Sequence, residues 1–281
     1  MSKNNLTVYK SNKVIEAGYK LSLNEQRLIL SCIAKVNSTK HLLATERFEV
    51  TAKEFSTLFS ISEDKAYQTL KHVAEQLFER YVIIDNPDPS EPTLKYTRTR
   101  WISSIDYIPE LGKVALYFAQ RMLPYLSELE GQFTFYELKN IGKMGSIYAI
   151  RLYELLMQWK TTRTREVEIE WLKKKFEIQD KYKSIKDFKK YVIEPAVKDI
   201  NNHSNYTVEW TQRKTGRRVT HLTFVFDEKA SKNPAKSKNK QPMIKGVPKS
   251  EIEHRARTGE SWEDAALRIK VENKADKIKV G

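Results

Sequence analysis

The chain of 281 residues contains a single cysteine, Cys32, and no apolar run long enough to cross a membrane. One cysteine excludes an internal disulfide, which suits a reducing compartment, and a spanning helix needs about 20 apolar residues. Residues 1–10 are polar and lack the apolar core of a secretion signal. We therefore expect a cytoplasmic protein without membrane contact.

Motifs of common catalytic sites are also missing. The five histidines are scattered, residues 142–146 lack the glycine spacing of a P-loop, and one cysteine cannot form a zinc–thiolate site. The 14 tyrosines fall mostly in apolar patterns typical of a core. We expect no enzymatic activity, no metal and no cofactor; a nicking enzyme is the least favoured alternative.

Acidic residues are in deficit, 36 against 50 lysines and arginines, which gives a net charge of +14. Residues 229–281 hold 14 of the basic and 7 of the acidic residues, so a solvated tail accounts for only half of the surplus. Because neutralising phosphates releases condensed counterions, a basic body favours a nucleic-acid partner.

Caps and hydrophobic periods predict the same order of elements twice: helix, strand, helix, turn, helix, hairpin. In the first copy a capping box at Ser22 and Glu25 starts a helix to about residue 36, and the later helices lie at 51–59 and 63–79. In the second copy a capping box at Thr134 and Glu137 starts a long helix to Trp159, and the later helices lie at 170–176 and 184–201.

This order is that of a winged helix, a helix-turn-helix with an appended β-hairpin. We therefore predict an α+β fold with two tandem winged-helix domains at residues 1–130 and 131–228. Residues 229–281 are predicted to form a flexible basic tail, with a linker at 231–249. A short amphipathic helix is predicted around Trp262, Ala265, Ala266 and Ile269.

The predicted helix at 184–201 is the one that would enter the DNA major groove. Polar and basic residues crowd its N-terminal half, and the turn of the following hairpin is basic as well. These candidate DNA-binding residues are Lys183, Ser184, Lys186, Lys189 and Lys190 on the helix, and Arg213, Lys214, Arg217 and Arg218 on the hairpin. The alternatives are a solvated lysine face and a solubilising hairpin tip. Pro195 falls inside the helical pattern and should kink the helix axis, because it removes an amide donor.

The first copy is less basic. Its third helix presents Lys65, Gln68 and Lys71 opposite the apolar side, and a strand at 96–100 carries Arg98 and Arg100. These five residues are further candidates for contact with bases or backbone.

Three segments in order, residues 21–28, 147–156 and 183–201, closely resemble the iteron-binding plasmid replication initiators of bacteria, and the resemblance covers about residues 6–228. It includes the Glu-Pro-Ala run at 194–196. It implies binding to direct repeats in double-stranded DNA at a plasmid origin, origin opening, and recruitment of the host replicative helicase and host initiator protein. It also implies a homodimer, formed through the first domain, that represses its own gene, with the monomer active at iterons.

The resemblance assigns base reading to Lys189 and Lys190, whereas the helical wheel favours Lys183, Lys186 and Lys190. Relatives often carry arginine at these positions, and lysine lacks the bidentate fork that arginine offers to guanine. The alternative function is that of a tandem winged-helix transcriptional repressor with no replication role.

Overall fold

The computed structural model describes residues 6–88, 90–129, 131–229, 243–245, 247–248 and 266–272. The chain divides into two compact units, residues 1–229 and residues 230–281, which we call the body and the tail. Among the described residues, none of the helices has the length and apolar character needed to cross a membrane.

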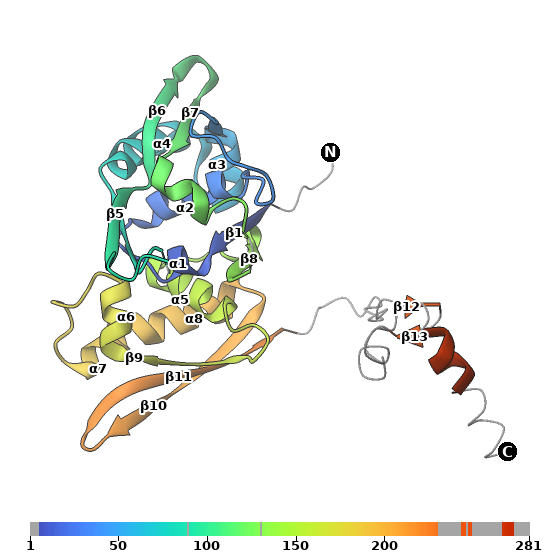
Figure 1. Ribbon diagram of the computed structural model, residues 1–281. Coiled ribbons are helices and arrows are strands. Elements are labelled where there is room, and N and C mark those ends of the chain that lie inside the picture. The colour runs from blue at the N-terminus through green and yellow to red at the C-terminus, as the bar shows by residue number, and fades with distance from the viewer. Residues whose placement is uncertain are drawn as a thin grey trace. The chain divides into compact units, whose positions relative to one another are not determined.

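The first half of the body is a winged helix (Figure 1). Three helices pack with a three-stranded antiparallel sheet of order β3-β7-β6. The elements are α2 (Leu23–Ile33), β3 (Phe48–Thr51), α3 (Ala52–Phe59), α4 (Glu63–Phe78), β6 (Ile102–Ile108) and β7 (Lys113–Phe118). The predicted capping box is present: the Glu25 amide donates to Ser22 Oγ over 3.3 Å, and the Ser22 amide donates to the Glu25 carboxylate over 2.5 Å.

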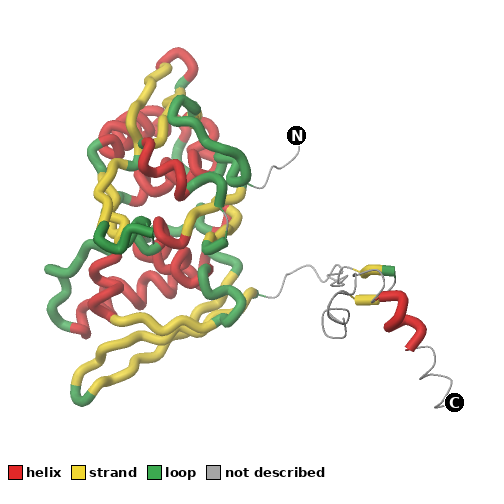
Figure 2. Tube along the Cα trace, viewed as in Figure 1, coloured by secondary structure: helices red, strands yellow, loops and turns green. Residues whose placement is uncertain are grey.

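The second half repeats this plan, with a sheet of order β10-β11-β9. In both halves the first strand pairs with the second strand of the hairpin, so the predicted tandem winged-helix fold is confirmed. Figure 2 shows the helices of each half beside its strands. The elements are α5 (Ile147–Met157), β9 (Thr164–Glu168), α6 (Ile169–Lys175), α7 (Ile185–Phe188), the π-helical turn η4 (Lys189–Ile193), α8 (Glu194–His203), β10 (Tyr206–Thr215) and β11 (Arg218–Glu228).

Further elements join or extend the first half. Two small sheets have the orders β1-β8 and β2-β4-β5. The additional elements are β1 (Thr7–Ser11), α1 (Asn12–Ile15), β2 (Gly18–Tyr19), β4 (Tyr81–Asp85), β5 (Tyr96–Arg100), η1 (Pro109–Leu111), η2 (Gln120–Tyr125), β8 (Phe133–Glu137) and η3 (Leu138–Asn140).

The predicted helix start at Thr134 is wrong, because Phe133–Glu137 is strand β8 and pairs with β1. The alternation Phe-Thr-Phe-Tyr-Glu suits a strand, with the second and fourth side chains buried. The helix begins later, at α5, where Ser146 Oγ caps the start by accepting from the Tyr148 amide over 3.2 Å.

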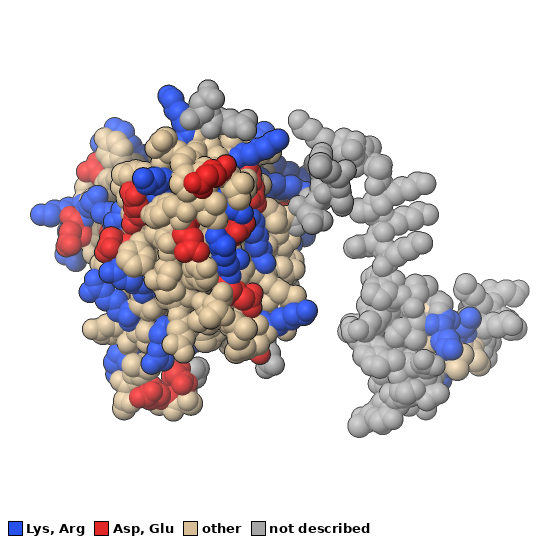
Figure 3. Space-filling model, turned by 90° about the horizontal axis from the view of Figure 1, so that it is seen from above, with Lys and Arg blue, Asp and Glu red and all other residues tan. Residues whose placement is uncertain are grey.

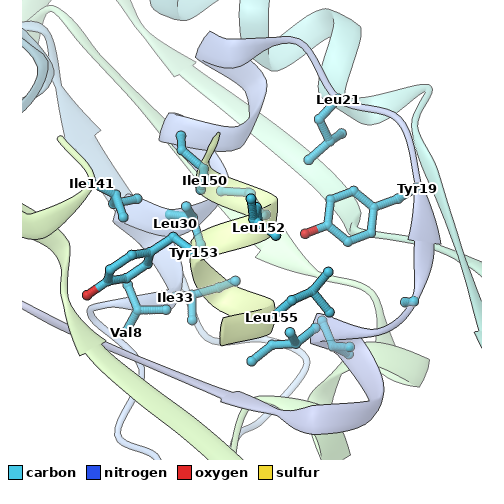
Figure 4. Packing of buried hydrophobic residues seen from close by; sticks show 14 of the residues in the cluster. Val8, Tyr19, Leu21, Leu30, Ile33, Ile141, Ile150, Leu152, Tyr153 and Leu155 are labelled. Atoms are coloured by element: carbon cyan, nitrogen blue, oxygen red, sulfur yellow. The ribbon is translucent and has the colours of Figure 1, made fainter. Parts of the chain in front are cut away.

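Helix α5 is central to the body. Its residues 149–157 are all buried, on every side of the helix, as expected for an element enclosed in a core. Figure 4 shows Ile150, Leu152 and Leu155 of α5 among side chains of the first half such as Leu30 and Val8. The two winged helices therefore share one continuous hydrophobic core.

A charged pair is enclosed in this shared core. Lys10 of β1 donates to Glu154 of α5 over 2.8 Å, and the two side chains are 1% and 0% exposed. The Tyr136 hydroxyl donates to the same carboxylate over 2.6 Å, and the Tyr19 hydroxyl lies 3.5 Å from its second oxygen. Burial raises the pKa of Tyr136 well above its usual value, so this phenol stays a hydrogen-bond donor.

The second half is also tied to the first by polar contacts. Lys175 of α6 donates to Asp85 over 2.8 Å, and Arg165 of β9 donates to Glu16 over 2.8 Å. Arg151 of α5 donates to the carbonyl oxygens of Ala17 and Lys175, over 2.8 and 3.0 Å. The two recognition surfaces described below are thus held at a defined separation.

Cys32 is fully buried, and burial raises the pKa of its thiol to about 12. The thiolate is the reactive form, so the native protein should be inert to a disulfide-exchange reagent at pH 8 and should react once unfolded in urea. Stoichiometric labelling of the native protein within minutes would contradict this placement.

The tail contains a hairpin, β12 (Met243–Ile244) and β13 (Val247–Pro248), and a helix over residues 266–272. Val247, Ala266 and Ile269 are buried against one another. The predicted helix is confirmed at Ala266 and Ile269, whereas Trp262 and Ala265 lie outside the described residues. The predicted linker at 231–249 is wrong at its C-terminal end, where the hairpin forms.

Candidate nucleic-acid interface

The second recognition helix runs from Ile185 to His203 through α7, η4 and α8. As predicted, Ser184 caps its start, because its hydroxyl oxygen accepts from the Lys186 amide over 3.2 Å. One side of the helix is buried in the core, through Phe188, Val192, Ile193, Ala196, Val197 and Ile200. The opposite side is left to solvent.

Pro195 lies near the start of α8 and does not end the helix. A proline inside a helix has no amide hydrogen, and its ring clashes with the carbonyl four residues earlier. Here the preceding turn is π-helical, and the Glu194 amide donates to the Lys189 carbonyl five residues back. The wider turn accommodates Pro195 at the start of α8. Such turns occur often at functional sites.

The structure separates the predicted lysines into two groups. Lys183, Lys186 and Lys190 are exposed, with no ion pair to another described residue. Lys189 is half-buried: it donates to Gln212 of β10 over 3.0 Å and lies 5.9 Å from the Trp210 ring. Lys189 therefore connects the helix to the hairpin, whereas the other three lysines are available to an external partner.

An exposed aromatic residue accompanies these lysines and was not among the predicted site residues. Tyr191 is 53% exposed. Its ring stacks with that of Tyr182 at 6.3 Å, and the Lys190 ammonium lies 4.9 Å from it. Large aromatic side chains on a groove-facing surface suit contacts to sugars and thymine methyl groups. The π-helical turn contributes to this exposure by changing the angular step after Lys189.

The tip of the β10–β11 hairpin is basic and exposed, as predicted, and Gly216 adopts a positive φ of 62° in its turn. Arg213 is engaged within the sheet, since it donates to Glu166 over 3.0 and 2.7 Å. Hydrogen bonding from Arg213 lowers the pKa of Glu166. Lys214, Arg217 and Arg218 form no ion pair among the described residues.

In the first half, α4 is the recognition helix. Lys65, Gln68 and Lys71 are exposed, and the first two line an open groove of 510 Å³ beside the helix. His72 and Asn24 line the same groove. The groove therefore brings Lys65 and Gln68 together, whereas Lys71 is exposed but does not line it.

The predicted arginines of β5 already have partners within the protein. The Arg98 guanidinium lies 3.7 Å from the centre of the Tyr81 ring. Arg100 donates to the Phe78 carbonyl and, over 3.2 Å, to Glu79 at the end of α4. Both side chains are nevertheless exposed at the surface. Arg100 stabilises the C-terminal end of α4, where a cation interacts favourably with the helix dipole.

Charge in the first half is mixed. Figure 3 looks onto the β6–β7 end of the body, where basic and acidic side chains alternate without a continuous basic patch. The basic surface is better developed on the second recognition helix and its hairpin.

Asp199 of α8 positions the second recognition helix. One carboxylate oxygen accepts from the amides of Gly145 and Ser146, each over 2.9 Å, directly before α5. The sequence pattern did not single out this residue, because the contact joins segments 53 residues apart. Within the described ranges, no cluster of three or more His, Cys, Asp or Glu side chains could hold a metal ion.

Comparisons with known proteins agree with this architecture. A family model described as "Initiator Replication protein, WH1" matches residues 7–157, and one described as "Initiator Rep protein, WH2" matches residues 168–226. The chain is 29% identical over 226 residues to a replication initiation protein of Escherichia coli, covering 78% of this chain and 69% of that protein. It is 24% identical over 236 residues to the PI protein of Escherichia coli, covering 73% and 77% respectively.

A solved structure is similar as well. The Pi initiator protein, in its complex with iteron DNA, matches with a TM-score of 0.70 at 21% identity, covering 82% of this chain and 100% of that one. This likeness supports the fold. Since the WH1 model alone matches more than half of the residues and the WH2 model follows it in order, the chain belongs to the initiator replication protein family, with two winged-helix domains in tandem.

Proposed function

We propose that this chain initiates replication of a bacterial plasmid by binding iterons, the direct repeats of a plasmid origin, as a monomer. The observation that carries the proposal is the presence, in an initiator-family chain, of two recognition helices on one body, the second with an unpaired basic surface. A helix-turn-helix enters the major groove, which is about 12 Å wide. One chain with two such helices suits successive grooves of an asymmetric site.

The proposed DNA contacts fall into two classes. Base edges and nearby backbone are contacted from the second recognition helix and the two residues before it, through Lys183, Ser184, Lys186, Lys190 and Tyr191. Lys189 holds the hairpin beside them. Lys214, Arg217 and Arg218 of the hairpin contact phosphates. In the first half, Lys65, Gln68 and Lys71 contact the second groove, with a smaller role for Arg98, Arg100 and Arg213 at the backbone.

Further partners are proposed from the family. We propose that the bound protein opens the origin and recruits the host replicative helicase and the host initiator protein in the bacterial cytoplasm. We also propose that a homodimer, formed through the first half, represses the gene for this chain. The name of the solved relative, an initiator in complex with iteron DNA, supports the choice of DNA site.

Footprinting on the DNA upstream of the gene tests the proposal. Protection of several direct repeats of about 20 base pairs, two turns of duplex, is expected for an initiator, whereas a single protected palindrome would favour a repressor. An origin plasmid that replicates in cells without this gene would contradict the proposed function. Nicking of supercoiled origin DNA in the presence of a divalent metal would contradict the expectation that this chain is not an enzyme.

Changes at the hairpin tip are expected to act through phosphates. With Arg217→Ala and Arg218→Ala combined, the slope of log affinity against log salt should become shallower by about two, because each phosphate contact contributes about one. The preference for iteron over unrelated duplex should change little. Fluorescence anisotropy across a salt series measures both quantities. A changed sequence preference with an unchanged slope would place these arginines at base edges.

A further inference from the structure

A cleft of 330 Å³ lies between the two winged helices. Its walls come from β2, the start of α2 and Arg80, just after α4, on one side, and from α5 and residues 176–181, just after α6, on the other. The volume is at the lower end of the range of small-molecule sites, which run from about 300 to 1,000 Å³. None of the proposed DNA-contacting residues lines this cleft.

Aromatic rings form much of the cleft wall. Tyr148 and Phe176 lie 5.5 Å apart at an interplanar angle of 31°. Tyr19 completes the wall, and the Arg151 guanidinium lies 3.5 Å from its centre. Such surfaces favour a flat ring, which stacks on aromatic and guanidinium groups.

Positive charge surrounds the same cleft. Lys20, Arg80 and Lys181 line it, and no acidic side chain does. Lys20 and Lys181 are exposed and form no ion pair among the described residues, while Arg80 pairs with Glu25 over 2.9 Å. Two free ammonium groups converging on one cavity favour an anion.

Two polar side chains in the wall have unused donors. Gln26 is 1% exposed and Arg151 is 4% exposed, and both line the cleft. The Gln26 amide nitrogen and the Arg151 Nε are buried without a hydrogen-bond partner. Buried donors are nearly always paired in native proteins, so these two are open to an acceptor in the cleft; Arg27 Nε and Trp101 Nε1, which also lack a partner, do not line it.

We propose that this cleft binds the phosphate ester of a nucleotide, with the phosphate at Lys20 and Lys181. The aromatic wall favours a free mononucleotide as the source, because a ring can stack beside Tyr148. The backbone of bound DNA is a second possible source of the phosphate ester. Only this second source rests on the proposed function in DNA binding. A ligand here contacts both winged helices at once and stabilises their arrangement.

Calorimetric titration of the full chain tests whether the cleft binds a free mononucleotide. The probes are AMP, adenosine and inorganic phosphate. AMP is expected to bind, adenosine at least tenfold more weakly. Lys20→Ala combined with Lys181→Ala should weaken AMP binding at least tenfold. The control is Lys40→Ala combined with Lys160→Ala, two exposed lysines outside the cleft, which should leave AMP binding unchanged. Lys181→Glu provides the same test if the double variant does not fold.

The salt dependence of iteron binding tests whether the cleft instead binds a phosphate of the DNA backbone. If AMP does not bind but the Lys20 and Lys181 double variant loses about two units of log–log slope, the phosphate comes from DNA. If AMP does not bind and the slope is unchanged, the proposal is wrong. A wild-type chain that binds AMP but shows no preference for iterons would contradict the proposed function and leave the cleft site intact.

Discussion

Replacing Glu154 by alanine is expected to lower the free energy of unfolding of the body by about 3–5 kcal/mol, the usual cost of removing one partner of a buried ion pair. The change leaves the Lys10 ammonium in the core without its partner, and it removes the acceptor of the Tyr136 hydroxyl. It also removes a contact between β1 and α5, two elements far apart in sequence. Urea unfolding followed by circular dichroism measures the effect.

The matched control is the exposed pair of Arg163 and Asp227, which are 2.6 Å apart and 63% and 65% exposed. Asp227→Ala should cost no more than about 1 kcal/mol, since exposed ion pairs contribute little. Replacing both buried partners, with Lys10→Met and Glu154→Leu, should recover much of the lost stability, because no unpaired charge remains. A Glu154→Ala variant as stable as the Asp227→Ala variant would show that the buried carboxylate does not stabilise the fold.

Replacing Lys190 by alanine is expected to weaken binding to an iteron by about 1–3 kcal/mol, which corresponds to roughly fivefold to 150-fold. Lys190 is exposed at the π-helical turn, unpaired among the described residues, and adjacent to the exposed Tyr191 ring. Binding to unrelated duplex, which depends on phosphates, should fall much less. Anisotropy with both duplexes at one salt concentration gives the ratio.

Lys198 offers a control with the same chemistry on the same helix, because it is exposed one turn beyond Pro195. Lys198→Ala should leave the preference for the iteron within about twofold, in keeping with the small contribution of charges outside the interface centre. Unchanged iteron affinity in the Lys190→Ala variant, or an equal loss in the Lys198→Ala variant, would refute the assignment of Lys190 to base reading.

Local signals predicted most of the helices, because caps and periods depend on neighbouring residues. The helix starts at Ser22 and Ser184 are confirmed by their cap hydrogen bonds. The β1–β8 pairing was missed for a physical reason: it joins Thr7–Ser11 to Phe133–Glu137, and no local pattern encodes a partner so distant. Thr134 and Glu137 matched a capping box by spacing alone. The division into domains at residues 1–130 and 131–228 stays a prediction. Strand β8 lies after the predicted boundary, but its pairing with β1 joins it to the first half.

The candidate interface was predicted in outline. A wheel of 100° per residue still identified Lys190, because the helix is regular up to Phe188, only two residues before it. It could not foresee that both Val192 and Ile193 are buried, since this needs the wider turn. It also missed Tyr191, as aromatic residues in an apolar pattern were assigned to the core. The roles of the predicted residues in DNA binding stay predictions.

The π-helical turn bears on how this protein could be redesigned or could diverge. Suppose that only Lys190 and its neighbours are replaced by the corresponding residues of a relative whose helix has no π-helical turn. The new side chains would then be displaced by about one residue around the helix from their positions in that relative. Residues 189–195, from the turn through Pro195, therefore have to be transferred together as one segment. A library that varies single positions within this unit samples altered backbone geometry along with altered chemistry.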